Sequence, residues 1–196
     1  MPDTGTPSSP LHLSPPDIIR WLSDNWQSSL RTMHSIYRFP QLATMGLDVP
    51  VRTVVLRDFQ TSPLSIQCHT DIRSAKVPQL RENPIATFHW YDPVERLQTI
   101  ARTTTVLHHG TNPARTAWER LTVHGKRQYS QIDSPGAEIQ GVSPRFADDS
   151  ESGWDHFCLI MATITEIDML HLRQGGNIRC RLTPEKTGWN RIWLAP

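Results

Sequence analysis

The stretch HTDIRSAKVPQLRENPIATFHWYD, from His69 to Asp92, changes its pattern twice. It begins with polar turn residues, continues as a short helix, and ends in alternating apolar residues that predict a strand. Arg73, Ser74 and Lys76 gather where the turn becomes the helix. A hydroxyl and two cations beside free main-chain N–H groups favour an anion. The alternative from these residues alone is an ordinary Ser N-cap with solvated charges beside it.

The neighbouring segments also have strand-like patterns. VRTVVLRDF, from Val51 to Phe59, is β-branched and mostly apolar, which predicts one well-buried strand. LSIQCHT, from Leu64 to Thr70, alternates apolar and polar residues, and the turn residues 61–63 before it predict a hairpin. Further strands are expected at 97–107, 157–172 and 177–194, the last two separated by Gly175-Gly176.

Two segments have helical periodicity. Ser14 is a good N-cap before Pro15, and apolar residues recur every four positions from Ile18 to Leu30, which predicts a helix of about 15 residues. The second helix is expected to begin at Asn112-Pro113, with Ala114, Ala117, Trp118 and Leu121 on its apolar face.

The remaining segments predict little regular structure. Residues 1–13 are rich in Pro, Ser and Thr and are expected to form a flexible arm, and 125–153 is loop-like. Residues 14–196 are then expected to form a single domain. Many short strands with few helices predict an α+β protein on an antiparallel sheet, which at this length often closes into a barrel.

Composition argues against several classes of function. The formal net charge of +1 disfavours a general nucleic-acid or membrane-surface binder, and no long apolar segment predicts a membrane span. Three widely spaced Cys without a CxxC pair predict neither disulfides nor a metal site, and a cytoplasmic location is the default expectation. The cations are 17 Arg and only three Lys, which suits phosphate or carboxylate binding; the alternative is a general Arg bias.

Three segments in order carry a family resemblance. They are VRTVVLRDF, then HTDIRSAKVPQLRENPIATFHWYD with ERLQTIA close behind, and finally RQGGNIRCRLTPEKTGWNRIWLAP. Together they resemble the pyridoxamine 5′-phosphate oxidase family of FMN-binding split barrels over most of 51–107 and 170–196. The resemblance implies an antiparallel split β-barrel with peripheral helices, FMN as the cofactor, and a homodimer with FMN at the subunit interface.

The resemblance also assigns roles to residues. Arg52, Lys76 and Ser74 match contacts of the FMN phosphate, and Thr70 a contact near the ribityl chain or the ring. The main chain of Thr53, Val54, Val55 and Leu56 matches the edge of the isoalloxazine ring. Gln98 matches a residue that reaches the flavin from the other subunit, and Arg181 is a further expected cofactor contact. Arg57 and Arg179 match substrate-side positions.

The sequence departs from the family pattern at several positions. Ala75 stands where these oxidases commonly have Arg, which raises the question whether Arg73 or Arg181 compensates. Arg173 stands in place of a flavin-stacking Trp. The segment WERLTVHGKRQYSQIDSPGAEI, residues 118–139, does not reproduce the segment that binds the substrate phosphate in the oxidases.

The resemblance therefore predicts an FMN-dependent oxidoreductase of a divergent branch, acting on a small molecule by hydride transfer to the flavin. No catalytic acid or base is assigned. The alternative is an FMN-binding carrier or sensor without turnover. A third reading, haem binding in a split barrel, rests on His108 and His109 alone.

Overall fold

The computed structural model describes residues 9–196. In this part of the chain nine strands form one antiparallel sheet in the order β2-β1-β5-β6-β7-β4-β3, and β8 and β9 extend it from β7. The strands are β1 Gln41–Thr44, β2 Val51–Thr53, β3 Leu56–Thr61, β4 Leu64–Asp71, β5 Ile85–Asp92, β6 Leu97–His108, β7 Phe157–His171, β8 Ile178–Glu185 and β9 Gly188–Leu194. The α-helices are α1 Pro15–Arg31, α2 Lys76–Glu82, α3 Asn112–Glu119 and α4 Val123–Arg127, and the 3₁₀ turns are η1 Pro10–His12, η2 Ile36–Arg38 and η3 Ser150–His156.

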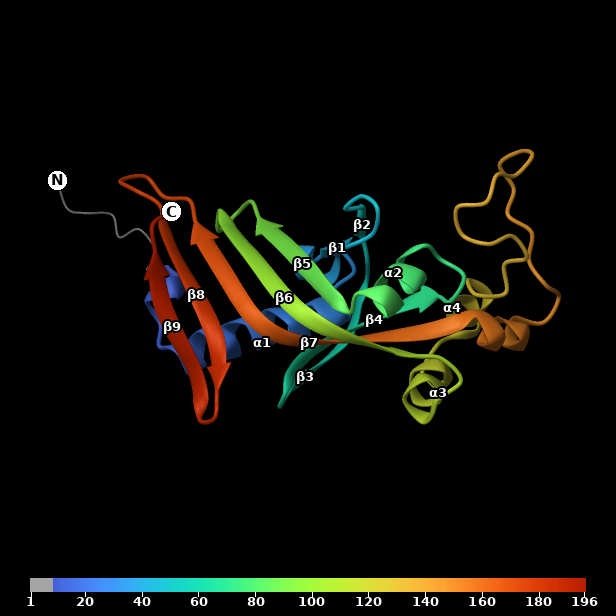
Figure 1. Cartoon of the computed structure of the whole chain (residues 1–196), viewed down its shortest axis with the longest axis horizontal. Coiled ribbons are helices and arrows are strands. Elements are labelled where there is room, and N and C mark those ends of the chain that lie inside the picture. Colours follow the sequence, from blue (N-terminus) through green and yellow to red (C-terminus); the bar gives the residue numbers. More distant parts are fainter. Residues whose placement is uncertain (1–8) are drawn as a thin grey trace.

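The long strand β7 is the point at which the sheet divides. One edge of β7 pairs with β6 over nearly its whole length. The other edge pairs with β4 over residues 157–163 and with β8 over 167–171. Figure 1 shows the result, with β8 and β9 at one end of the molecule and α2, α3 and α4 toward the other. The expected α+β class and antiparallel split barrel are confirmed.

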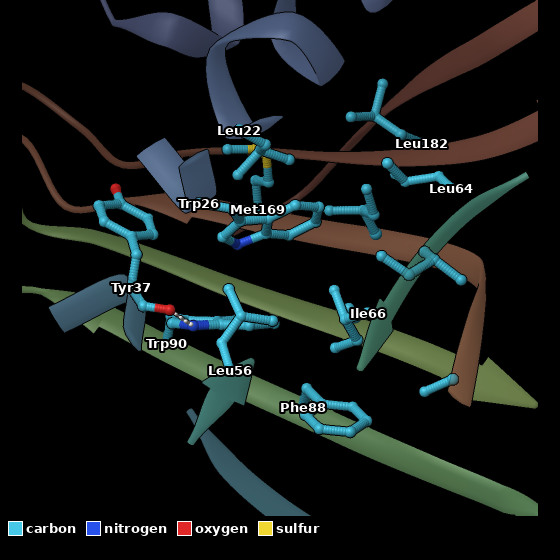
Figure 2. Packing of buried hydrophobic residues seen from close by; sticks show 14 of the residues in the cluster. Leu22, Trp26, Tyr37, Leu56, Leu64, Ile66, Phe88, Trp90, Met169 and Leu182 are labelled. Atoms are coloured by element: carbon cyan, nitrogen blue, oxygen red, sulfur yellow. Dashed lines mark hydrogen bonds between the residues drawn. The ribbon is translucent and has the colours of Figure 1, made fainter. Parts of the chain in front are cut away.

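Helix α1 covers the inner face of the sheet. The side chain of Ser14 accepts a hydrogen bond from the main chain of Asp17, so the N-cap expected from the sequence is present. Leu22 and Trp26 are buried against Met169 and Leu182 from β7 and β8 (Figure 2). The alternating strand residues that complete this core include Leu56, Ile66, Phe88 and Trp90. Burial of these large side chains is the main stabilising contribution to the barrel.

A smaller core lies at the other end of β7. Trp118 of α3 is fully buried against Phe157, with ring centroids 5.3 Å apart. Tyr129 and Trp154 pack around the same two rings. The expected apolar face of the second helix is thus confirmed: Ala114 and Trp118 are buried, and Ala117 and Leu121 pack against the same core, although Leu121 lies just beyond the end of α3.

The expectation of one buried strand from Val51 to Phe59 is wrong. The chain forms two strands, β2 and β3, with Val54 and Val55 between them, and β2 is largely exposed at the sheet edge. Val54 donates its main-chain N–H to Pro40 instead of to a neighbouring strand. The partner of β2 is β1, a strand too short for its pattern to be recognised in the sequence.

Two other expectations need correction. Residues 9–13 are not a loose arm, because Leu11 is fully buried and its carbonyl accepts a hydrogen bond from Arg191. The remainder of the expected arm, residues 1–8, lies outside the described residues. The segment 125–153 is also less irregular than expected, since it contains most of α4 and the beginning of η3. Within residues 9–196, no helix has the length and apolar character that crossing a membrane requires.

Candidate functional site

A cluster of polar side chains lies where β4 passes into α2. The Lys76 ammonium donates to the hydroxyls of Thr70 and Ser74, at 3.0 Å from each oxygen. The two hydroxyls are 3.0 Å apart and nearly buried. Ser74 therefore does not cap α2 with its side chain, and the ordinary N-cap reading of this residue is wrong. Its hydroxyl instead belongs to a compact set of donors.

The Arg52 side chain of β2 is held by residues of β1 and α2. Its Nη1 donates to Thr44 Oγ1 at 2.6 Å, and its Nη2 lies 3.4 Å from Gln79 Oε1. The Thr44 hydroxyl in turn donates to Gln79 at 2.6 Å. Thr44 and Gln79 thus orient the guanidinium, and sequence reasoning missed both, because neither lies near Arg52 along the chain.

The two cations are close enough to affect each other. Burial lowers the pKa of Lys76, and the positive charge of Arg52 lowers it further. Burial also lowers the pKa of Arg52. Among residues 9–196, no carboxylate lies within ion-pair distance of either cation. Two partly buried cations with adjacent hydroxyls and no acid partner fit an anion such as a phosphomonoester.

Arg73 does not belong to this cluster. Its guanidinium binds both carboxylate oxygens of Asp71 and the main-chain carbonyls of Gln131 and Ile132. The structure therefore gives no support to Arg73 as a substitute for the arginine that Ala75 replaces.

Arg57 lies in a separate pocket. Residues 67 and 69 of β4 line this pocket, whereas Cys68 and Thr70 point to the opposite face of the strand. The cavity has a volume of about 180 Å³ and is bordered by Arg38, Arg57, Asp58 and Arg120. Arg38 is already bound to two carbonyls of α1, and Arg120 pairs with Asp58 at 3.3 Å.

His69 is a pocket residue that sequence reasoning did not single out. Burial, helped by the charge of Arg57, lowers the pKa of His69 to about 3. Its Nδ1 is buried without a hydrogen-bond partner among the described residues, and its ring packs edge-on against Phe157 at 4.9 Å. The imidazole is therefore neutral at physiological pH.

Gln98, Arg179 and Arg181 lie on the outer face of the sheet. Gln98 is in register with Leu170, and Leu170 with Arg179. Arg179 binds both carboxylate oxygens of Asp168. Arg181 Nε lies 3.2 Å from Glu166 Oε1, and the same oxygen accepts a hydrogen bond from Arg102. The acids Glu166 and Asp168 of β7 are thus paired with arginines of the neighbouring strands β6 and β8.

The outer-face group and the Lys76 cluster are far apart within one chain. Thr70 pairs with Cys158, whereas Gln98 pairs with Leu170, twelve positions further along β7. At about 3.3 Å per residue this separation is up to about 40 Å along the strand. One chain therefore does not bring all the expected cofactor contacts together.

The two histidines that suggested haem are bound elsewhere. The Nδ1 of His109 lies 3.0 Å from the Phe157 carbonyl, and that of His108 lies 3.4 Å from Thr111 Oγ1. Among the described residues, no group of three or more potential metal-binding side chains occurs.

Comparisons with known proteins find similar sequences and folds. Residues 20–108 match the family model described as the FMN-binding domain of pyridoxamine 5′-phosphate oxidase. The pyridoxine/pyridoxamine 5′-phosphate oxidase 2 of Arabidopsis thaliana is 29% identical over 153 residues, covering 71% of this chain and 75% of the plant protein. The segment 20–108 matched by the family model contains Arg52, Thr70, Ser74, Lys76 and Gln98.

Solved structures extend the similarity to nearly the whole chain. A pyridoxamine 5′-phosphate oxidase-related, FMN-binding protein of Nostoc punctiforme has a TM-score of 0.73 at 25% identity, covering 90% of this chain and 96% of its own. PhzG of Burkholderia lata shares the fold, with a TM-score of 0.71 at 14% identity over 99% of this chain and 98% of its own. Residues 20–108 therefore match the FMN-binding domain of the pyridoxamine 5′-phosphate oxidase family, and the chain has the same split-barrel fold as the FMN-binding protein of Nostoc punctiforme.

Proposed function

We propose that this protein is a homodimeric FMN-dependent oxidoreductase that acts on a small molecule. The observation that carries the proposal is the cationic cluster of Arg52 and Lys76 with the hydroxyls of Thr70 and Ser74. A phosphomonoester carries nearly two negative charges and several strong acceptor oxygens. It would replace the mutual repulsion of the two cations by charge-assisted hydrogen bonds.

The main chain that follows Arg52 leads from the phosphate cluster to Arg57. Arg52 is followed directly by residues 53–56, where the break between β2 and β3 leaves main chain outside the ladder at Val54 and Val55. A flavin ring lying along this main chain would end beside Arg57, the next residue. FMN, when bound, would supply the hydride-accepting ring, and the residues of this chain would bind and orient it.

A second subunit would supply the contacts that one chain cannot. Gln98 and Arg181 are too far along β7 from Thr70 to touch the same FMN. They lie on the outer face of the sheet, where Ile85, Tyr91, Val106 and Ile192 are exposed apolar side chains. Pairing of two such faces would bury this apolar surface and bring Gln98 of the partner subunit to the cofactor.

The pocket beside Arg57 indicates the kind of substrate. Arg57 has no carboxylate within ion-pair distance among residues 9–196, whereas the nearby Arg120 and Asp58 compensate each other. The pocket is therefore suited to a small molecule with an anionic group. Arg179 would be a further substrate contact, contributed by the partner subunit. Pyridoxamine and pyridoxine 5′-phosphate are the first substrates to test, because a relative at 29% identity is named for that oxidation.

A non-catalytic FMN carrier or sensor is the second candidate. Its support is the ion pairing of the outer face, since Asp168 and Glu166 already neutralise Arg179 and Arg181. Lys126, in the segment that departs from the family pattern, is likewise paired with Glu151 at 2.6 Å. Cations that are already paired offer less attraction to a substrate anion.

Anaerobic mixing separates the two candidates. The FMN-loaded protein is mixed with pyridoxamine 5′-phosphate without oxygen, and the visible flavin absorption is followed; air is then admitted and oxygen uptake recorded. An oxidase loses the absorption and regains it in air with oxygen consumption. If no small-molecule donor bleaches the flavin while FMN remains tightly bound, the carrier or sensor function replaces the enzyme.

A further inference from the structure

The ion pair between Arg73 and Asp71 lies directly beside the Lys76 cluster. Arg73 Nε is 3.0 Å from Asp71 Oδ1, and Arg73 Nη2 is 2.7 Å from Asp71 Oδ2. The main-chain N–H of Arg73 also donates to Oδ1, at 2.8 Å. The two side chains are only 20% and 10% exposed, so this pair is more rigid and less screened than a surface pair.

The same guanidinium reaches a distant segment of the chain. Nη2 donates to the Gln131 carbonyl at 2.8 Å and Nη1 to the Ile132 carbonyl at 3.1 Å. These residues open residues 131–146, which we name the clamped loop. The loop closes on itself through the Gln131–Phe146 bridge and the hydrogen bond from Ile132 N to Arg145 O. Arg73 therefore joins the base of this loop to the turn that carries Ser74.

The position of Asp71 makes its charge important. Asp71 is close enough to Lys76 to raise its pKa, although burial and the charge of Arg52 lower that pKa by more. A carboxylate at this position would repel a phosphate bound to Lys76 unless its own charge were compensated. Arg73 supplies that compensation and leaves the charges of Arg52 and Lys76 available for an anion.

We propose that Arg73 is a positioning residue for the FMN phosphate site: it neutralises Asp71 beside Lys76 and fastens the clamped loop to the turn that carries Ser74. The inference rests on the proposed FMN site but assigns Arg73 a role other than contact with the cofactor. The guanidinium of Arg73 donates to Asp71 and to the loop carbonyls, so Arg73 would affect FMN binding indirectly, without touching the phosphate.

The two parts of this role predict different effects of substitution. Arg73→Ala uncovers Asp71 and releases the loop. Arg73→Lys retains a cation near Asp71 but loses the geometry needed to bind the carboxylate and two carbonyls together. Arg73→Ala combined with Asp71→Asn removes the uncompensated charge while leaving the loop unfastened. Arg31→Ala, an exposed arginine at the end of α1, is the matched control.

The test measures FMN and riboflavin affinity by flavin fluorescence, and hydrogen exchange of residues 131–146 by mass spectrometry. We expect Arg73→Ala to weaken FMN binding on the order of tenfold without changing riboflavin binding, because riboflavin has no phosphate. Adding Asp71→Asn should restore FMN affinity, whereas loop exchange should remain faster than in the unsubstituted protein. Arg73→Lys should bind FMN nearly normally with a faster-exchanging loop, and it provides the test if Arg73→Ala does not fold.

Distinct results would overturn different claims. Unchanged FMN affinity and unchanged loop exchange in both Arg73 variants would refute the inference while leaving the FMN site intact. Failure of Asp71→Asn to restore affinity would refute the electrostatic part. If the unsubstituted protein binds FMN no better than riboflavin, the proposed phosphate site itself fails, and the electrostatic role of Arg73 with it.

Discussion

Arg179 binds both carboxylate oxygens of Asp168, with Nε 2.9 Å from Oδ1 and Nη2 3.0 Å from Oδ2. The partners differ in exposure, since the Asp168 side chain is 4% exposed and that of Arg179 is 34%. The acid raises the pKa of Arg179 through this hydrogen-bonded contact. The pair is therefore asymmetric: the buried Asp168 carboxylate needs Arg179 to compensate its charge, whereas the more exposed Arg179 can be solvated by water.

Substitution of the two partners should have unequal effects on stability. Arg179→Ala leaves a buried carboxylate whose remaining cation, Arg181, is 3.9 Å away. Asp168→Asn leaves an arginine that can turn toward water, so the free energy of unfolding should fall less than in Arg179→Ala. Urea denaturation of both variants checks the order, and equal losses would show that the burial of Asp168 does not control the pair.

The imidazole of His69 should make the protein sensitive to acid. Its pKa is about 3 in the folded protein and 6.5 in an ordinary setting, so below pH 6.5 the unfolded chain binds a proton that the folded chain does not. Stability from this group is thus full above pH 6.5 and is lost as pH falls toward 3. The loss between pH 7 and pH 4.5 should be about 2.5 kcal/mol.

His69→Phe should remove this part of the acid sensitivity. The buried Nδ1 has no partner to lose among the described residues, and a phenyl ring can keep the edge-on contact with Phe157. Denaturation curves at the two pH values provide the measurement, with His124→Phe on exposed α4 as the matched control. If the free energy of unfolding of His69→Phe fell as much between pH 7 and pH 4.5 as that of the unsubstituted protein, other groups would be responsible for the acid sensitivity.

Lys76 should give FMN binding a pH dependence of its own. Its pKa is lowered from 10.5, first by burial and then by Arg52, so the ammonium loses its proton at a lower pH than an ordinary lysine. Without an anion this shift costs stability while Lys76 is charged, and stability recovers as pH rises through the lowered pKa. FMN affinity should fall over the same range, whereas riboflavin affinity should not. Lys76→Arg should move this fall in FMN affinity to higher pH, and titration of flavin fluorescence against pH checks both.

The proposed dimer can be tested with hybrid subunits. Arg52→Ala/Lys76→Ala chains lack the phosphate cluster, and Gln98→Ala/Arg181→Ala chains lack the contacts expected from the other subunit. Each homodimer should bind FMN weakly, whereas a hybrid of the two should regain one complete site with normal affinity. Co-expression with two different tags isolates the hybrid. If it binds no better than the parent homodimers, the two residue groups do not share a site.

Local pattern was sufficient where burial and periodicity coincide. Helix α1 and the strands containing Phe88 and Ile66 follow from periods of about 3.6 or 2 residues, whereas the Ser14 cap and the hairpin at residues 61–63 follow from capping and turn residues. The β2–β3 break does not, because the β-branched run at Val51–Leu56 fits one strand as well as two. The hydrogen bond from Val54 to Pro40 comes from tertiary contact.

The site was predictable to a similar extent. Ordered motifs singled out Thr70, Ser74 and Lys76, and the structure brings these residues together. Arg73 has one partner nearby in the sequence, Asp71, but its loop partners Gln131 and Ile132 lie more than fifty positions away. No local sequence pattern relates Arg73 to these two residues, so its contact with the loop could not be predicted without the structure.

The most direct test of the central claim is the affinity of the purified protein for FMN compared with riboflavin. We predict that the unsubstituted protein binds an equimolar amount of FMN per chain and prefers it strongly to riboflavin. Arg52→Ala/Lys76→Ala should reduce FMN affinity on the order of a hundredfold, because two charge-assisted contacts are lost, and should leave riboflavin affinity unchanged. Equal affinity of the unsubstituted protein for the two flavins, or unchanged FMN affinity in the double variant, would contradict the phosphate site.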